Sequence, residues 1–512
     1  MKKSKFIRWL LVIILCPFLF VFASFMFLIL APGVEIFGIR YVAVGQGEYE
    51  LPQSEEFMPN FSGDIYIEAE DIPINIKFDL IHNVHVEYKQ VFVGFTRSKN
   101  KFPAFSYEVK DNNLHLKSSD LVTFLYSTQD LNSADCYYNV YLPYEMKDRN
   151  IFVKSLNGVI NFNASGSKKL KNVSFETINK VNITGELNVE ELKFSTRESI
   201  TITENINAEK YILDIGNNDF KIDRDIAGTV DVQSGGATLY MKKANKVVFK
   251  SSSGSLKPIK DSEIIVNDCV VETKSGIVEI AQINSDNDNV VKTTSGSIKV
   301  GSAGNVIIEN LRGNTTVGSV KTANIVGGFG SITVGEVLSK ITAETKNGNI
   351  FLGEEEKKVN NPTVKSATGK IIVNNGCGNI DLNSENNSVK MFGDAVTKVK
   401  INAGEEVEAT NLTGKIDITA NGLVDVQIIK ITDDVTIKTT DGCRNVNVDL
   451  KNHILNDFNY SFKSTKARIV NIYSGENLVT EGESEVRRSP LINGLFDVII
   501  ETTYSDINVY CK

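Results

Sequence analysis

Histidine is the side chain that most often carries acid–base and metal chemistry near neutral pH, and this 512-residue chain has only His82, His85, His115 and His453. His82 and His85 are an odd number of residues apart, so on one strand they would point to opposite faces. His85 and His115 could meet across strands, but a closed zinc site needs four ligands and no cysteine cluster joins them. We therefore expect ordinary, half-exposed strand histidines and no metal site.

Other catalytic and cofactor-binding motifs are missing from the sequence. No serine stands in a Gly-x-Ser-x-Gly elbow, which a serine hydrolase would need together with a histidine partner. Gly369-Lys370 and Gly414-Lys415 lack the upstream glycine and the following Ser or Thr of a phosphate-binding loop. We interpret them as turn residues, and predict no catalytic residue and no cofactor.

Two segments partly resemble calcium-binding loops. Residues 327–331 read Gly-Gly-Phe-Gly-Ser, but Ile332 stands where a calcium-binding repeat has aspartate. Residues 286–289 offer closely spaced oxygens without the glycine and the glutamate of a calcium loop. We interpret the first as a corner and the second as a solvated tip, and assign the carboxylate runs 354–356 and 433–434 to exposed turns.

The cysteines do not form a recognisable framework. Cys16 follows Ile14-Leu15, where lipoprotein processing requires small residues, so we interpret it as structural. No Cys-x-x-Cys pair occurs, and one long-range disulfide stays open as an alternative. The six cysteines are Cys16, Cys136, Cys269, Cys377, Cys443 and Cys511.

The first 31 residues predict a membrane anchor. Residues 9–31 contain no charge and follow Lys2, Lys3, Lys5 and Arg8. A membrane-spanning helix needs about 20 apolar residues, more than the apolar core of a secretion signal. Because basic residues stay on the cytoplasmic side, residues 1–8 are expected to be a cytoplasmic tail and the remainder to be exported.

The exported part is acidic. Residues 1–40 have five basic groups and one acidic group, so the net charge of −8 leaves −12 on the rest of the chain. Binding to nucleic acid is disfavoured, because its affinity comes mainly from Lys and Arg that neutralise phosphates.

After a linker at 32–47, strand patterns dominate. Residues 48–150 show apolar and polar residues in alternation, as in Asp64-Ile-Tyr-Ile-Glu, and predict a small β region. From residue 151 a glycine followed by apolar residues two and four places later recurs, with second alternating strands between the copies. The clearest run of glycines, separated by 20, 17, 17 and 18 residues, is Gly276, Gly296, Gly313, Gly330 and Gly348.

This repeat predicts the fold. Each copy is too short to bury its apolar face alone, so the copies must stack. We predict an all-β, elongated parallel β-solenoid (β-helix) at 151–494, right-handed as parallel crossovers usually are, with C-terminal strands or a cap at 495–512. Glycine is expected at corners because it takes positive φ without penalty. One copy closes either a whole coil or half of one, and Thr315 makes the copy at Gly313 degenerate.

The alternation also predicts which side chains face inward. Within the copies that begin at Gly296, Gly330 and Gly348, Lys299 and Thr333 should point to solvent. The side chains expected in the core are Ile298, Val300, Ile332, Val334, Ile350 and Leu352.

Three segments resemble a known bacterial family. Tyr138-Asn-Val-Tyr-Leu-Pro-Tyr followed by Ile151-Phe-Val-Lys-Ser-Leu-Asn-Gly-Val-Ile, and the later Lys292-Thr-Thr-Ser-Gly-Ser-Ile-Lys-Val, are similar to phrases of the bacterial putative-adhesin domain family, a domain of unknown function. The resemblance covers about residues 60–450. It implies a solenoid on an envelope protein and brings no catalytic residue.

These observations favour a membrane-anchored extracellular surface module that is adhesive or structural and not an enzyme. Its expected partners are the lipid bilayer, through the N-terminal helix, and an extracellular or envelope protein or polysaccharide. The alternatives are an accessory protein in envelope sensing, acting through a partner because the tail has only eight residues, and a polysaccharide-acting enzyme. The enzyme is disfavoured because no aromatic-rich insertion would build a sugar cleft, and the only tryptophan is Trp9 in the anchor.

Overall fold

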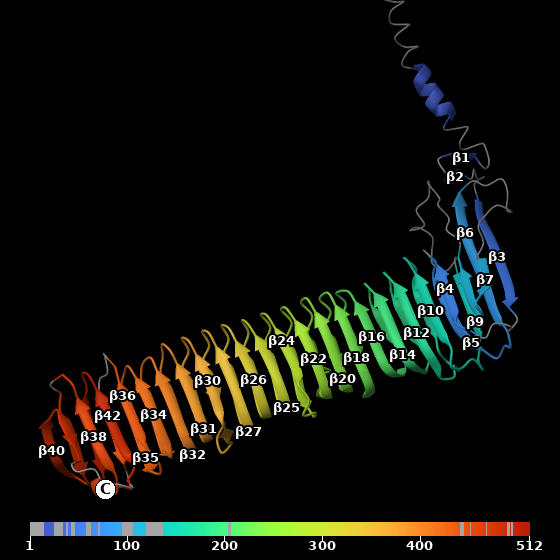
Figure 1. Ribbon diagram of the computed structural model, residues 1–512. Coiled ribbons are helices and arrows are strands. Elements are labelled where there is room, and N and C mark those ends of the chain that lie inside the picture. Colours follow the sequence, from blue (N-terminus) through green and yellow to red (C-terminus); the bar gives the residue numbers. More distant parts are fainter. Residues whose placement is uncertain are drawn as a thin grey trace, which may run out of the picture. The chain divides into compact units, whose positions relative to one another are not determined.

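Alternating residues fold into short strands that stack in parallel, and the chain is an all-β parallel β-solenoid of about 15 turns, as predicted (Figure 1). The chain divides into two compact units, Met1–Asn218 and Asp219–Lys512. The computed structural model describes residues 15–24, 34–36, 39–41, 47–57, 63–69, 72–94, 106–118, 137–202, 206–440, 445–450, 452–466, 468–488, 492 and 495–512.

The strands of the first unit are β1 (Val34–Ile36), β2 (Ile39–Tyr41), β3 (Gly47–Phe57), β4 (Ile65–Ala69), β5 (Ile74–Asp79), β6 (Val84–Gly94), β7 (Ser106–Lys110), β8 (Asn113–Lys117), β9 (Tyr137–Pro143), β10 (Asn150–Ser155), β11 (Ile160–Asn163), β12 (Leu170–Thr177), β13 (Val181–Thr184), β14 (Leu187–Thr196), β15 (Ile200–Ile202) and β16 (Ile206–Ile215).

The second unit begins with β17 (Phe220–Ile222), β18 (Ile226–Ser234), β19 (Leu239–Met241), β20 (Lys243–Ser251), β21 (Leu256–Pro258), β22 (Ile265–Thr273), β23 (Val278–Ile283), β24 (Asn289–Thr293), β25 (Ile298–Asn310), β26 (Thr315–Gly327), β27 (Ile332–Thr345), β28 (Ile350–Leu352), β29 (Val359–Asn360) and β30 (Pro362–Ser366). It continues with β31 (Ile371–Ser384), β32 (Val389–Ala403), β33 (Val407–Thr413), β34 (Lys415–Ala420), β35 (Val424–Lys430), β36 (Val435–Thr439), β37 (Asn445–Leu450), the 3-10 helix η3 (Leu455–Asp457), β38 (Asn459–Ser464), β39 (Val470–Ser474), β40 (Asn477–Glu483), β41 (Glu485–Arg487), β42 (Asp497–Thr502) and β43 (Asp506–Cys511).

In the first unit, coils begin before residue 150. Strands β4 and β5, within the region 48–150 expected to precede the solenoid, pair in parallel with β10 and β11. On their other side β4 and β5 pair in parallel with β8 and β9. Antiparallel strands β7 and β6 then cover β8 and β9. The coil order at this end therefore differs from the chain order, because β4 and β5 lie between strands that follow them in sequence.

The interior of the first unit is filled partly by aromatic rings. Phe162 packs edge-on against Phe175 with ring centroids 5.2 Å apart, and Phe175 stacks on Phe194 at 5.4 Å. All three side chains are buried. Large buried rings supply apolar area that three-residue strands such as β15 lack.

In the second unit, one glycine repeat closes one whole coil, which decides between the two alternatives left open by the sequence. Ile298 pairs with Thr315, and Thr315 pairs with Ile332, so neighbouring rungs are 17 residues apart. The long strand β25 pairs with β26 along its whole length, from Ile298 to Asn310. Thr315, the degenerate position, is 2% exposed and accepts a hydrogen bond from Asn310 Nδ2 at 3.3 Å.

The predicted inward register is confirmed. Ile298, Ile332 and Ile350 are at most 1% exposed, as are Val300, Val334 and Leu352. Lys299 is exposed and Thr333 is half-exposed between them. The period of two in the sequence therefore sets the core of each coil.

The repeat glycines are needed for a different reason from the one we expected. At Gly296 a Cβ atom would lie 1.7 Å from the carbonyl oxygen of Gly276 in the preceding coil, and no positive φ occurs there. A side chain is therefore excluded because the backbones of two neighbouring coils are in contact, and not because the glycine has a positive φ. The same clash with the glycine one coil before recurs at Gly276, Gly313, Gly330, Gly348 and Gly369. Positive φ is found elsewhere, for example at Gly414 and at Asn375.

The C-terminal segment 495–512, for which the sequence left strands or a cap open, forms strands that lie inside the stack. Strand β42 pairs in parallel with β36 on one side and β38 on the other. Strand β43 lies in the same way between β37 and β39. The open edges of β38 and β39 are covered by antiparallel strands β41 and β40. Residues 459–487 therefore form the cap, because an uncovered coil would leave backbone groups unpaired.

The expected membrane helix is described only in part. Residues 15–24 are helical, whereas 9–14 and 25–31 lie outside the described residues. No helix among the described residues has the length and apolar character needed to cross a membrane.

Candidate functional site

Several corners of the second unit are held by a buried hydroxyl three residues before the repeat glycine, and at Gly313 the amide oxygen of Asn310 takes its place. Thr273 Oγ1 donates a hydrogen bond to Gly254 O at 2.9 Å and accepts one from Gly276 N at 3.1 Å. Ser366 Oγ makes the equivalent bonds, to Gly348 O at 3.1 Å and from Gly369 N at 2.8 Å. The hydroxyl satisfies backbone groups that the turn would otherwise leave buried without partners.

In four successive coils the residue before the corner side chain faces solvent, and these four residues alternate in charge. Register pairs Lys250 with Glu272, Glu272 with Lys292, and Lys292 with Glu309. Lys250 Nζ lies 3.9 Å from Glu272 Oε2, and Lys292 Nζ lies 2.9 Å from Glu309 Oε1. The hydrogen bond to Glu309, followed by its charge, raises the pKa of Lys292. We call Lys250, Glu272, Lys292 and Glu309 the charge ladder.

Val326 ends the charge ladder. Val326 lies in the coil that follows Glu309, pairs with it and is 46% exposed. A lysine at this position would continue the alternation of charges. Leu311, at the adjacent corner, is also 46% exposed. These two side chains form exposed apolar surface next to the charge ladder.

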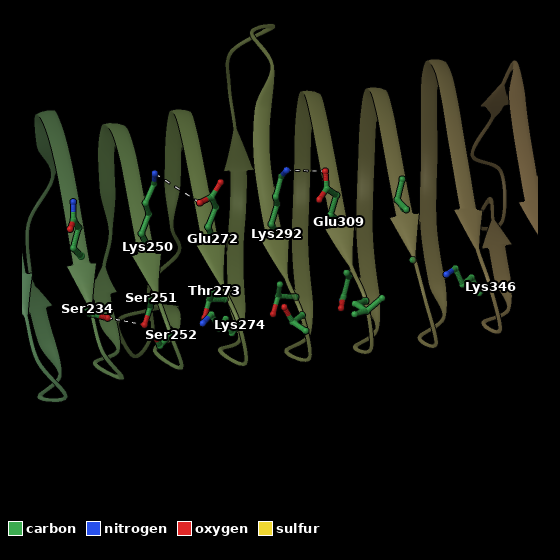
Figure 2. A pocket seen from close by; sticks show the side chains of 17 residues that line it. Ser234, Lys250, Ser251, Ser252, Glu272, Thr273, Lys274, Lys292, Glu309 and Lys346 are labelled. Atoms are coloured by element: carbon green, nitrogen blue, oxygen red, sulfur yellow. Dashed lines mark hydrogen bonds and ion pairs between the residues drawn. The ribbon is translucent and has the colours of Figure 1, made fainter.

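A groove of about 1040 Å³ runs along this face across successive coils (Figure 2). The charge ladder forms one side of it, and Ser251, Ser252, Thr273 and Lys274 lie at the corner below. Lys346 closes the far end. No ring contributes to the lining, and its polar groups recur from coil to coil.

The structure does not bring the four histidines together. His85 is on β6 and His115 on β8, which belong to different sheets. His85 Nε2 lies 3.5 Å from Glu87 Oε1, and the His115 ring stacks on Tyr66 at 4.5 Å. His82 is an exposed loop residue.

His453 has a structural contact instead: its Nε2 accepts a hydrogen bond from Ile431 N at 3.1 Å. Among the described residues no group of three or more His, Cys, Asp and Glu side chains could hold a metal ion.

The two segments that partly resemble calcium-binding loops have structural contacts of their own. Asn289 is buried, and its Oδ1 accepts a hydrogen bond from Cys269 N at 2.8 Å. Asp286 Oδ2 lies 2.6 Å from Lys321 Nζ. In the segment 327–331, Gly330 packs on the backbone of Gly313 at a coil corner.

Both carboxylate runs also have partners: Glu354 pairs with Lys357 at 2.6 Å, and Asp434 Oδ1 accepts a hydrogen bond from Asp497 N at 3.1 Å.

None of the four cysteines that the structure describes is shown in a disulfide. Cys16 is exposed, whereas Cys269, Cys377 and Cys511 are buried. Burial, and then the charge of Asp268, raises the pKa of Cys269 to about 12. A thiol with so high a pKa is a poor nucleophile. Cys136 and Cys443 lie outside the described residues.

A scan against protein-family models and a search of curated proteins found no match. Among solved structures, the chain is similar to a putative cell adhesion protein from Clostridium sporogenes ATCC 15579, with 9% identity and a TM-score of 0.17, covering 91% of this chain and 100% of that one. It is also similar to a putative adhesin from Bacteroides fragilis NCTC 9343, with 13% identity and a TM-score of 0.17, covering 62% and 97%. Both descriptions agree with the family that the sequence resembles. Superpositions with so low a TM-score carry no argument about function, which rests on the groove.

The groove was not predicted from the sequence. Lys274 and Lys346 look like ordinary exposed lysines in a strand-rich chain, and the ladder residues become neighbours only through the coil register. A signal was present, however: a charged residue followed by Ser or Thr and, three residues later, glycine, as in Glu272-Thr-Lys-Ser-Gly276.

Proposed function

We propose that the chain is an exported, non-catalytic surface module that is held to the cell membrane by residues 9–31 and binds an extended ligand in an adhesive role. The groove carries this proposal. Its polar side chains recur once per coil, which suits a linear polymer better than a compact metabolite. The ligand class is a polysaccharide or an extended protein segment.

Two features of the groove support a non-catalytic role. Sugar hydrolysis needs two cooperating carboxylates on either side of the bond that breaks. In the groove Lys292 lies between Glu272 and Glu309 in the coil register, so a cation occupies the space between the two carboxylates.

Anchoring is supported by the sequence of the N-terminus. Residues 9–31 have no charge and follow four basic residues, and their central part, 15–24, is helical. The basic flank favours a cytoplasmic N-terminus and an extracellular C-terminal part.

Protease treatment of intact cells that express the full chain tests this topology. We expect the part beyond the anchor to be degraded while a short N-terminal fragment stays with the membranes. A variant in which a cleavable secretion signal replaces residues 1–31 should be released into the medium. A chain that stays intact in whole cells but is degraded in lysed cells would contradict export.

Retention of cells on coated surfaces tests the adhesive role. Cells that express the full chain should be retained better than cells that lack it on at least one envelope polysaccharide or matrix protein. The released variant is the matched control and should give no increase. Equal retention on every coating would contradict adhesion.

A further inference from the structure

The lysines of the groove are of two kinds. Lys250 and Lys292 face Glu272 and Glu309 across the charge ladder. Lys274 and Lys346 are exposed at the corners, and no ion pair joins either of them to another described residue. The groove thus has four lysines against two glutamates, in a chain whose net charge is −8. We propose that it binds an anionic polysaccharide, an inference that rests on the proposed surface function.

The positions of the two unpaired lysines require a long ligand. Lys274 follows the corner residue Thr273, and Lys346 follows Thr345, which occupies the same place four coils later. Four coil steps of about 4.8 Å separate the backbones by roughly 19 Å. A single sugar or a small anion cannot contact both lysines, whereas one polymer chain lying along the stack can.

The remaining lining suits a sugar backbone. Ser252 and Thr294 are exposed at the positions equivalent to Lys274 in the coils on either side of it, and hydroxyl groups can both donate and accept hydrogen bonds. Leu311 and Val326 offer exposed apolar surface to the C–H face of a sugar ring. Unpaired lysines and exposed hydroxyl groups at the corners favour a sugar polymer that carries both carboxylates and hydroxyl groups along its length.

Binding of the full chain, in detergent, to immobilised polygalacturonate tests the proposal. We expect binding that weakens as salt is raised, because exposed charges are screened, and little binding to neutral dextran. The double variant Lys274→Gln/Lys346→Gln should bind at least about tenfold more weakly, a difference of about 1.4 kcal/mol. Its melting temperature should be unchanged because both side chains are exposed.

The matched control is Lys299→Gln/Lys340→Gln, which removes two exposed lysines outside the groove. This variant should bind as the unaltered chain does. Equal loss in both double variants would show that net charge alone governs binding and would overturn the assignment to the groove. Equally tight binding of poly-glutamate would overturn a polysaccharide in favour of an acidic polypeptide.

The cell-retention assay separates this inference from the proposed function. If expression still increases retention while polygalacturonate does not bind, the adhesive role stands and the ligand class is wrong. If polygalacturonate binds through Lys274 and Lys346 but expression does not change retention on any coating, the ligand class stands and adhesion is wrong.

Discussion

Thr439 Oγ1 donates a 2.7 Å hydrogen bond to Thr502 Oγ1, although 63 residues separate the two in sequence. The bond joins β36 to β42, the strand that lies between β36 and the earlier-synthesised β38. The C-terminal residues therefore fill an interior position in the stack. Asn508 extends the same relationship: its Nδ2 donates to Asn447 Oδ1 at 3.0 Å, and its Oδ1 accepts from Asn471 Nδ2 at 3.1 Å.

Ending the chain after Arg488 removes β42 and β43. This should destabilise the cap strongly, although the removed residues are the last in the sequence. We expect backbone amides of 435–474 to lose protection against hydrogen exchange while those of 265–366 keep it, because each coil contacts mainly its neighbours. Leu478→Ser, on the partly exposed strand β40, is the control and should leave protection unchanged. Full protection of 435–474 in the shortened chain would mean that β38 can dock directly on β36.

Replacing Ile332 with Asp should destabilise the solenoid strongly. Ile332 is 1% exposed, and a buried charge without a partner costs roughly 3–5 kcal/mol. Thr333→Asp, one residue along the same strand but on its outer face, should change stability by less than about 1 kcal/mol. Thermal melting of the two variants checks the register, and equal shifts would refute it.

Gly296→Ala should be costly even though alanine is small. Its Cβ would lie 1.7 Å from Gly276 O, so the backbones of two coils would have to separate. Gly475 is the matched control: its φ is +59° and a Cβ added there would meet no atom within 4 Å, so Gly475→Ala adds only left-handed strain of roughly 1–2 kcal/mol. We expect the larger loss of melting temperature for Gly296→Ala, and the reverse order would contradict the contact between backbones.

Asp425 should make the chain less stable as pH rises. Shielding from water, then the charges of Glu408 and Asp449, raises the pKa of this carboxyl above its usual value of 3.8. The folded state therefore binds the proton more tightly than the unfolded state. The stability of the folded state therefore falls as pH rises from the usual pKa of 3.8 through the raised pKa of the folded state. It is regained when the pH is lowered again.

Asp425→Asn should accordingly raise the melting temperature at neutral pH and have little effect at roughly pH 3, where the carboxyl is protonated in both states. Asp288→Asn, at an exposed position before β24, is the control and should show no comparable gain. A lower melting temperature for Asp425→Asn at neutral pH would contradict the direction of the pKa shift.

The sequence predicts those features of the fold that depend on neighbours in the chain. Ile332 and Val334 could be assigned to the core because a period of two is a local property of a strand. The place of β42 could not be assigned in this way, since Val498 and Ile500 alternate as every other coil does and would fit beside any of them. The alternation therefore predicts that a segment forms a coil, but it does not predict which coils lie next to it.

The candidate site depends on contacts between coils, which the sequence does not order. Glu272 and Lys292 are 20 residues apart, and only the pairing of β22 with β24 makes them neighbours. The glycine spacing indicated the correct period, but its cause could not be found from the chain alone, because the contact of Gly296 with Gly276 O exists only after stacking.

The alternating signs of the charge ladder constrain how such a gene can change in length. Recombination between repeats that removed the coil of Lys292 alone would set Glu272 against Glu309, whereas removal of the coils of Glu272 and Lys292 together would set Lys250 against Glu309 and preserve attraction. Loss or duplication of one interior coil, that of Glu272 or Lys292, therefore creates repulsion at the new junction, whereas loss or duplication of both together does not. In this part of the molecule, coils can be lost or gained without like charges meeting when they change in adjacent pairs.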